Sequence, residues 1–123
     1  NIFFEGDLPF DTLLAKKYIE RLNLKNSTMP EDLLNTVINS INADFSGGQI
    51  QKISLIRTLM SKKNIIIFDE PTNGLDFKSK NRFLQCIREL NKDKIVIIIS
   101  HDRIFMCDDF KVVDVVDCNF IIR

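Results

Sequence analysis

The sequence lacks several features that would direct attention to particular classes of protein. It has no net charge, with 17 Lys and Arg against 17 Asp and Glu, so neither a nucleic-acid footprint nor a polybasic membrane patch is expected. Its apolar runs reach only about five residues, too short to cross a bilayer or to form a signal peptide. The three cysteines have no C-x-x-C or metal-binding spacing, so reduced cytosolic thiols are the simplest interpretation.

The most informative stretch begins with a Ser-Gly-Gly-Gln turn at residues 46–49. The apolar positions that follow fall three or four residues apart, which predicts a helix with Gln51 and Lys52 on its polar face. At the N-terminus of such a helix, free N–H groups and the helix dipole favour an anion, and glycine allows it to approach closely. An ordinary serine N-cap with a flexible glycine entry is the alternative. The apolar positions are Ile50, Ile53, Leu55, Ile56, Leu59 and Met60.

A short apolar run at residues 65–68 follows and ends in two adjacent carboxylates, Asp69 and Glu70. The run is β-branched and too short for a helix, which predicts a parallel strand buried on both faces. Ligands of open α/β sheets collect beyond the carboxyl ends of such strands. Asp69 is therefore suited to hold Mg²⁺, directly or through water, and Glu70 to polarise an attacking water. A solvated acidic strand end is the alternative.

A second helix followed by a second strand is predicted towards the C-terminus. Asp76 is suited to cap a helix over residues 77–90, with Lys80 among its outward-facing charges. A second β-branched run at residues 95–99 predicts another parallel strand buried on both faces, and His101 follows its end. A lone histidine is usually structural or on the surface, but this one ends a strand beside the acid pair.

Together these segments resemble, in order and spacing, the motifs of ATP-binding-cassette (ABC) ATPases. The sequence is identified as a member of this family. The run from Thr36 to Ser46 aligns without a gap with the T-x-V-G-E-x-G-x-x-L-S run of its exporter branch, although Ser40 replaces the glutamate that contacts coupling helices. Residues 45–49 resemble the signature motif, 65–70 the Walker B strand, 70–76 the segment leading into the D-loop, and 97–101 the H-loop strand.

The resemblance implies an α/β fold, the second half of a P-loop NTPase (ABC ATPase) domain. A helical subdomain that carries the signature is expected over residues 1–61. The Walker B, D-loop and H-loop part of the RecA-like core is expected over residues 62–123, as parallel strands with helices followed by a terminal β-hairpin. Within the first part, helices are expected at residues 11–22, with Asp11 as N-cap, and from Pro30.

No G-x-x-x-x-G-K-[ST] motif occurs, so the loop that cradles the β- and γ-phosphates in this family is lacking. The Q-loop glutamine would lie upstream of Asn1, because Phe4-Glu5-Gly6 matches the pattern that follows the Q-loop. The resemblance therefore covers only the second half of a cassette. We expect this half to be inactive alone and to leave sheet edges and apolar faces uncovered.

The site that the resemblance implies has a part acting in trans and a part acting in cis. In the family, the signature of one subunit closes over ATP held by the partner in a head-to-tail dimer. The residues at the strand ends act on the ATP of their own subunit, where the histidine hydrogen-bonds the γ-phosphate. The implied ATP-binding residues are Ser46, Gly47, Gly48, Gln49 and Asp76, the implied catalytic residues are Glu70 and His101, and the implied metal ligand is Asp69.

The function implied is ATP binding and hydrolysis with Mg²⁺, coupled to export of a substrate across a membrane. The implied partners are a second ABC ATPase domain and a transmembrane domain at the cytoplasmic face of the cell membrane, without nucleic acid. A soluble ABC protein acting on ribosomes is one alternative, although those proteins usually carry histidine in place of Gly74. An SMC-like head lacks support because no coiled-coil heptads flank the signature. A non-catalytic fragment that binds a partner cassette is the third alternative.

Overall fold

The computed structural model describes residues 11–24, 45–90, 92–116 and 119–122 of the 123-residue chain. Helices and strands are both present, and α4 (Phe77–Leu90) connects two parallel strands, which confirms the predicted α/β class. The helix predicted from Pro30 lies outside the described residues. In chain order the elements are α1 (Thr12–Arg21), α3 (Gly47–Leu59), β1 (Ile65–Asp69), α4 (Phe77–Leu90), β2 (Ile95–Ile99), the 3-10 helix η1 (Arg103–Phe105), β3 (Val113–Val116) and β4 (Asn119–Ile122).

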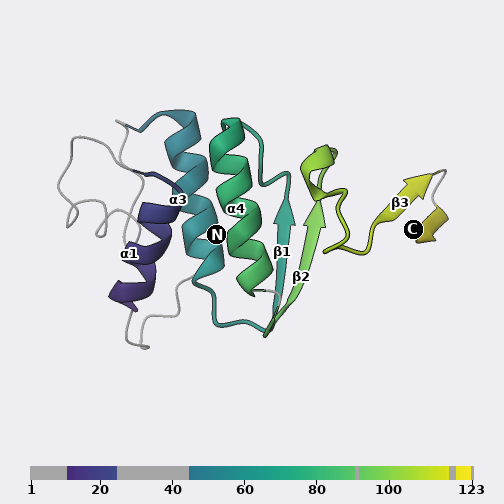
Figure 1. The fold of residues 1–123 in the computed structure, drawn as a ribbon, viewed down its shortest axis with the longest axis horizontal. Helices are drawn as coiled ribbons and strands as arrows, with labels where there is room; N and C mark the ends of the chain where they lie inside the picture. The colour runs from purple at the N-terminus through teal and green to yellow at the C-terminus, as the bar shows by residue number, and fades with distance from the viewer. Residues whose placement is uncertain (1–10, 25–44, 91, 117–118, 123) are drawn as a thin grey trace.

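The strands of the described residues form two small sheets. β1 and β2 pair in parallel, with Ile65 opposite Ile95 and Asp69 opposite Ile99, and α4 forms the connection between them. β3 and β4 form the antiparallel hairpin predicted at the C-terminus. Figure 1 shows α1, α3 and α4 side by side on one side of the parallel pair, with the hairpin at the far end. No helix among the described residues is long and apolar enough to cross a membrane.

Each of the three α-helices in the described part of the chain follows a residue whose side chain caps it. The Asp11 carboxylate accepts the N–H of Leu14 at 2.9 Å. Ser46 forms a capping box with Gln49 at the start of α3. The Asp76 carboxylate accepts the N–H three residues on, at 2.9 Å, at the start of α4. These bonds satisfy N–H groups that have no partner within the helix, and they explain why each helix begins where its sequence predicts.

One hydrophobic core lies between the helices and the parallel strands. Phe83 of α4 is fully buried, and its ring meets that of Phe68 edge to face, with the ring centroids 5.2 Å apart. Ile53 and Ile56 bring α3 into the same cluster. The other buried apolar members are Tyr18, Ile19, Leu22, Leu24, Leu55, Leu59, Ile66, Leu75, Leu84, Cys86, Ile87 and Phe105.

The prediction that both strands are buried on both faces is wrong for this structure. Burial alternates along β1, where Ile66 and Phe68 face the helices while Ile65 and Ile67 are 55% and 60% exposed. The reason is that helices cover only one face of the two-stranded sheet, and no described element covers the other. The expectation of an uncovered apolar face is therefore confirmed. We call this the isoleucine face, formed by Ile65, Ile67, Ile95, Ile97 and Ile99.

The one-sided core makes Phe83 a test of the fold. Phe83→Ala removes a fully buried ring that contacts Phe68, so we expect the free energy of unfolding to fall by about 3–5 kcal/mol. Urea denaturation followed by circular dichroism measures this. Phe77→Ala is the matched control, because Phe77 lies on the same helix but is 79% exposed. Equal losses for both variants would contradict the core described here.

Candidate functional site

The candidate site lies where β1 and β2 end side by side. Because Asp69 lies opposite Ile99, the residues that follow each strand emerge at the same edge. The N–H of Glu70 donates to the carbonyl oxygen of Ile99 at 2.8 Å, which extends the strand pairing one residue further. The register thus brings together Glu70 and His101, both predicted as catalytic.

The Glu70 carboxylate contacts both residues that follow β2. Its Oε1 lies 2.9 Å from Nδ1 of His101, and its Oε2 accepts a hydrogen bond from Oγ of Ser100 at 3.3 Å. A carboxylate accepts only, so Nδ1 of His101 is the donor in this contact. The His101 side chain is 82% exposed and that of Glu70 is 33% exposed. The rest of the imidazole ring is therefore accessible to a ligand.

Glu70 has an unusual backbone. Its φ of 45° lies in the left-handed region, where a residue with a Cβ is strained by roughly 1–3 kcal/mol. The bond from its N–H to Ile99 and the bond from the Asn73 N–H to its carbonyl oxygen, at 3.2 Å, hold this conformation. The conformation turns the chain out of the sheet at the carboxylate. Strain of this kind concentrates at functional sites, which supports a role for Glu70.

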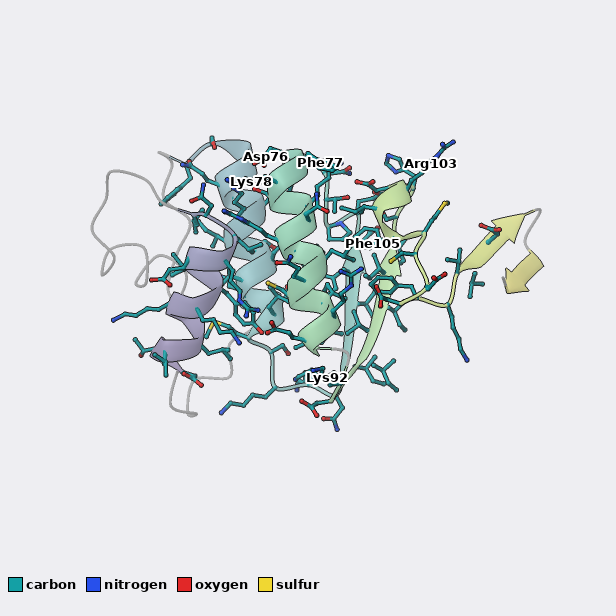
Figure 2. All side chains as sticks on the ribbon, in the orientation of Figure 1. Asp76, Phe77, Lys78, Lys92, Arg103 and Phe105 are labelled. Atoms are coloured by element: carbon teal, nitrogen blue, oxygen red, sulfur yellow. The ribbon has the colours of Figure 1, made fainter. Side chains whose placement is uncertain are left out.

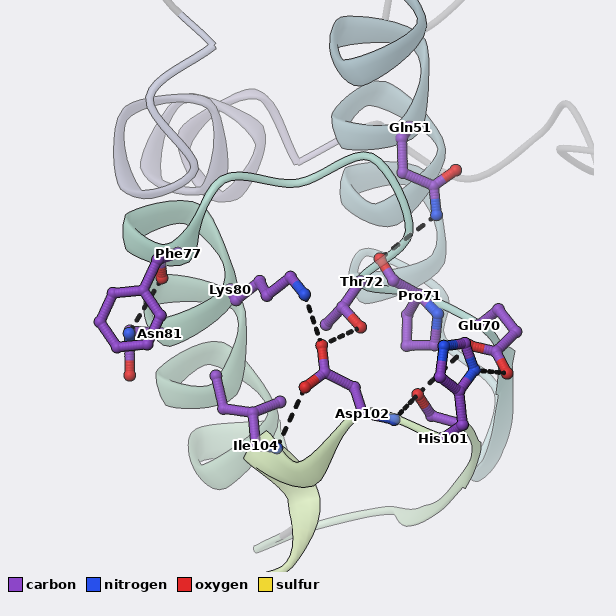
Figure 3. A network of polar contacts seen from close by, with 11 residues as sticks. Gln51, Glu70, Pro71, Thr72, Phe77, Lys80, Asn81, His101, Asp102 and Ile104 are labelled. Atoms are coloured by element: carbon purple, nitrogen blue, oxygen red, sulfur yellow. Dashed lines mark hydrogen bonds and ion pairs between the residues drawn. The ribbon is translucent and has the colours of Figure 1, made fainter.

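The Asp102 carboxylate forms the centre of a polar network beside the pair (Figure 3). Its Oδ2 accepts hydrogen bonds from Oγ1 of Thr72 at 2.9 Å and from Nζ of Lys80 at 2.6 Å. Its Oδ1 accepts the N–H of Ile104 at 3.2 Å. Lys80, the Ile104 N–H and the Thr72 hydroxyl together lower the pKa of Asp102 below the ordinary value. The prediction that Lys80 points outward is wrong, because this ion pair holds its ammonium group against the strand ends.

The predicted signature residues form the N-terminus of α3. The Ser46 N–H donates to Oε1 of Gln49 at 2.7 Å, and the Gln49 N–H donates to Oγ of Ser46 at 3.4 Å. This is the geometry of a serine N-cap. A Cβ at Gly47 would meet nothing within 4 Å, whereas a Cβ at Gly48 would lie 3.1 Å from the carbonyl oxygen of Gly74. Internal packing alone therefore favours glycine at Gly48, while the backbone of Gly47 is open to a ligand.

The polar side of α3 is packed against the turn that follows Glu70. Nε2 of Gln51 donates to the carbonyl oxygen of Pro71 at 3.2 Å, and Nζ of Lys52 lies 3.9 Å from Oδ2 of Asp76. The Lys52 side chain is only 13% exposed, so this part of the predicted polar face is covered by the turn and not by solvent. Hydrogen bonds from Ser79, with Lys52 nearby, lower the pKa of Asp76. Asp76 is thus brought beside the signature helix.

The parts of the site share one end of the molecule. Figure 2 shows Asp76 and Phe77, at the start of α4, at the same end as Arg103, whereas Lys92 lies at the opposite end. Arg103 begins η1, two residues after His101. The structure therefore brings Glu70 into contact with His101 and Asp76 close to α3, but it gives no direct contact between these two groups.

Asp69 fits the part of a single metal-binding carboxylate. It is exposed at the end of β1, one residue before Glu70. Among the residues that the structure describes, no group of three or more His, Cys, Asp and Glu side chains is arranged to hold a metal. Mg²⁺ commonly binds through one or two carboxylates together with phosphate oxygens and water, so an isolated carboxylate suits a metal delivered with a nucleotide.

The sequence patterns missed the residues that surround the predicted pair. Ser100 and Asp102 flank His101, and Thr72 lies two residues after Glu70. Their closeness in the chain to the predicted pair was a signal that could have found them. Lys80 offered no signal, because its partner Asp102 is 22 residues away on another element.

The parallel strand pair and the helix that connects it form part of an α/β fold of the P-loop NTPase class. A solved structure described as an RNase-L inhibitor has the same fold, with a TM-score of 0.50 and 22% identity, and the match covers 89% of this chain and 22% of that one. A family model described as ABC transporter matches residues 11–73. The chain therefore belongs to the ABC transporter family, as its motifs predict.

Curated relatives include ATP-binding proteins of exporters. The alpha-hemolysin translocation ATP-binding protein HlyB of Escherichia coli is 35% identical over 88 residues, which are 65% of this chain and 12% of HlyB. The ATP-dependent lipid A-core flippase of Aliivibrio fischeri is 35% identical over 92 residues, 68% of this chain and 16% of the flippase. The chain thus spans less than a fifth of the length of these relatives.

The two signature glycines give a matched test of the packing at α3. Gly48→Ala places a Cβ against the Gly74 carbonyl oxygen, so we expect the free energy of unfolding to fall by roughly 1–3 kcal/mol. Gly47→Ala meets open space and should be neutral or stabilising by up to about 1 kcal/mol, since alanine favours helix. Thermal and urea denaturation compare the two variants. A Gly48→Ala variant as stable as Gly47→Ala would contradict the contact with Gly74.

The Asp102 network predicts a pH dependence of stability. Because the pKa of Asp102 is lowered in the folded chain, its contribution is present above the ordinary aspartate pKa, about 3.9, and is lost as the pH falls through the lower folded value. Asp102→Asn should therefore be less stable than the wild type at about pH 7, and the difference should shrink towards about pH 3. Urea denaturation at both pH values measures this, with exposed Asp93→Asn as the control. A difference that is unchanged or larger at acid pH would contradict the assignment.

Proposed function

We propose that this chain is part of the ATP-binding and hydrolysing unit of an ABC transporter that exports a substrate across a membrane. The observation that carries the proposal is the contact of Glu70 with Nδ1 of His101 at 2.9 Å, at the adjoining ends of two parallel strands. The family and the exporter titles of its relatives support the same conclusion.

In this proposal the strand-end residues act on the ATP that is bound by their own ABC ATPase domain. Glu70 polarises the attacking water, and its position is fixed because both of its carboxylate oxygens are engaged. His101, with most of its ring exposed, hydrogen-bonds the γ-phosphate and orients that water; because its Nδ1–H is donated to Glu70, the ring must carry a second proton on Nε2 to donate to a phosphate oxygen. Asp69 would hold Mg²⁺, which neutralises charge on the phosphates. Catalysis then depends on positioning and on charge stabilisation.

The N-terminus of α3 acts on a second nucleotide in the same proposal. Gly47 leaves its backbone open, and the free N–H groups and dipole of a 13-residue helix favour a phosphate there. Ser46, Gly48 and Gln49 would complete this contact to ATP held by a second ABC ATPase domain in a head-to-tail dimer. Asp76, 64% exposed beside α3, would reach across the same interface.

The isoleucine face suits packing against the rest of an ABC ATPase core. Five exposed isoleucines in two paired strands form an apolar surface that favours burial. We propose that residues 1–61 form the helical signature subdomain, that residues 62–123 form part of the RecA-like core, and that this core is completed by the segment carrying the phosphate loop. The assembled unit would bind a transmembrane domain at the cytoplasmic face of the membrane, and the chain alone would be inactive.

Substitution of Glu70 tests this function. The chain is mixed with the first half of a related ABC ATPase domain, which carries G-x-x-x-x-G-K-[ST], and ATP hydrolysis is measured. We expect hydrolysis only in the mixture, and Glu70→Gln should lower kcat about 10²- to 10⁴-fold because the general base is lost.

The matched control is Glu89→Gln, which removes a carboxylate paired with Lys17 and Arg21 on the far part of α4. This variant should keep its activity. Hydrolysis by the chain alone, or equal activity of Glu70→Gln and the wild type in the mixture, would contradict the proposal.

A further inference from the structure

Asp102 has no chemical role in the proposed mechanism, yet its carboxylate connects the two loops that hold Glu70 and His101. It follows His101 directly in the chain. It accepts the hydroxyl proton of Thr72 at 2.9 Å, and Thr72 lies two residues after Glu70 (Figure 3). One side chain thus joins the segment after β1 to the segment after β2, just beyond the Glu70–His101 contact.

The Thr72 end of this connection is deeply buried. Thr72 is only 1% exposed, and Asp102 is the acceptor for its hydroxyl group. A buried hydroxyl that lost this acceptor would be unsatisfied, so the bond resists opening. Lys80 of α4 balances the carboxylate charge at 2.6 Å and ties both loops to the helix. The connection therefore has a fixed position relative to the core.

The backbone of Asp102 also directs the second contact of Glu70. The Asp102 N–H donates to Oγ of Ser100 at 3.1 Å. Because this bond occupies a lone pair of the Ser100 oxygen, the hydroxyl proton is directed to Oε2 of Glu70 at 3.3 Å. Oε1 is then left for Nδ1 of His101. The backbone of Asp102 thus acts on the Glu70 carboxylate through Ser100, while its side chain holds the segment after Glu70 through Thr72.

We infer that Asp102, with Lys80 as its counter-ion, is a positioning residue that fixes the Glu70 carboxylate against Nδ1 of His101. The inference deepens the proposed function and rests on it for its effect on catalysis. Its structural consequence is independent of ATP hydrolysis. With Glu70 held in place, the neutral His101 ring carries its proton on Nδ1, and loss of Asp102 lets this proton redistribute between the two ring nitrogens.

The test uses the only histidine of the chain. The ¹⁵N NMR spectrum of the imidazole is recorded at alkaline pH, and the neutral ring is identified by its two distinct nitrogen signals. We expect the Nδ1–H tautomer to dominate in the wild type and a mixture of tautomers in Asp102→Ala. Asp109→Ala is the matched control. It also removes an aspartate from an ion pair, with Arg88 at 2.6 Å, but this pair is not part of the site.

The same variants are assayed for ATP hydrolysis in the mixture with the complementary half. Asp102→Ala should lower kcat by roughly 10- to 100-fold with little change in KM, because misplaced catalytic groups slow the reaction without weakening ATP binding. Asp102→Asn keeps an acceptor for Thr72 and should retain more activity. If Asp102→Ala fails to fold, Thr72→Val, which removes only the buried hydroxyl, gives the same NMR comparison.

The outcomes separate this inference from the proposed function. If His101 keeps the Nδ1–H tautomer of the wild type in Asp102→Ala, the positioning role is overturned. The same holds for Thr72→Val where Asp102→Ala does not fold. An unchanged kcat in an active mixture also overturns the positioning role. A shifted tautomer with no hydrolysis by the wild-type mixture supports the positioning of His101 by Asp102, and it overturns the proposed ATPase function instead.

Discussion

The parallel register of β1 and β2 is the constraint on which the site depends. Glu70 and His101 are 31 residues apart in sequence, and they meet because Asp69 lies opposite Ile99 at the strand ends. A change of register by one residue would also turn one strand over; for β1, Ile66 and Phe68 would move to the exposed face and Ile65 and Ile67 into the core. Packing against α3 and α4 therefore selects the pairing that brings the two polar side chains together.

The core is built on one face of this sheet, and this explains an error of the sequence-based prediction. A continuous β-branched run is typical of a strand covered on both faces, and residues 65–68 form such a run. Such a run indicates that both faces of the strand are apolar enough to be buried. Whether they are buried depends on which elements are present to cover them. In this structure helices cover one face only, and the isoleucine face keeps the apolar character of a surface made for packing.

Other parts of the structure were predictable where the signal is local. The bounds of α4 could be read from the sequence because Asp76 caps its start and the apolar spacing ends at Leu90. The positions of Glu70 and His101 at adjoining strand ends were predictable because each follows an apolar β-branched run. The ion pair of Lys80 with Asp102 was not predictable, since it joins a helix to a loop, and helical spacing alone assigns Lys80 to solvent. The packing reason for Gly48 was hidden too, because it depends on the Gly74 carbonyl oxygen.

The turn between Glu70 and Asp76 is held from two sides, which links the two groups of candidate residues physically. On one side, α3 contacts it through the bond from Gln51 to Pro71 and the close approach of Gly48 to Gly74. On the other side, the buried Thr72 hydroxyl binds Asp102, next to His101. The turn is short and Thr72 is almost fully buried, so a displacement of α3 relative to the sheet must break one of these contacts or move the turn with it. The helix N-terminus and the strand ends, which we propose to bind two different phosphates, are therefore not independent parts of the molecule.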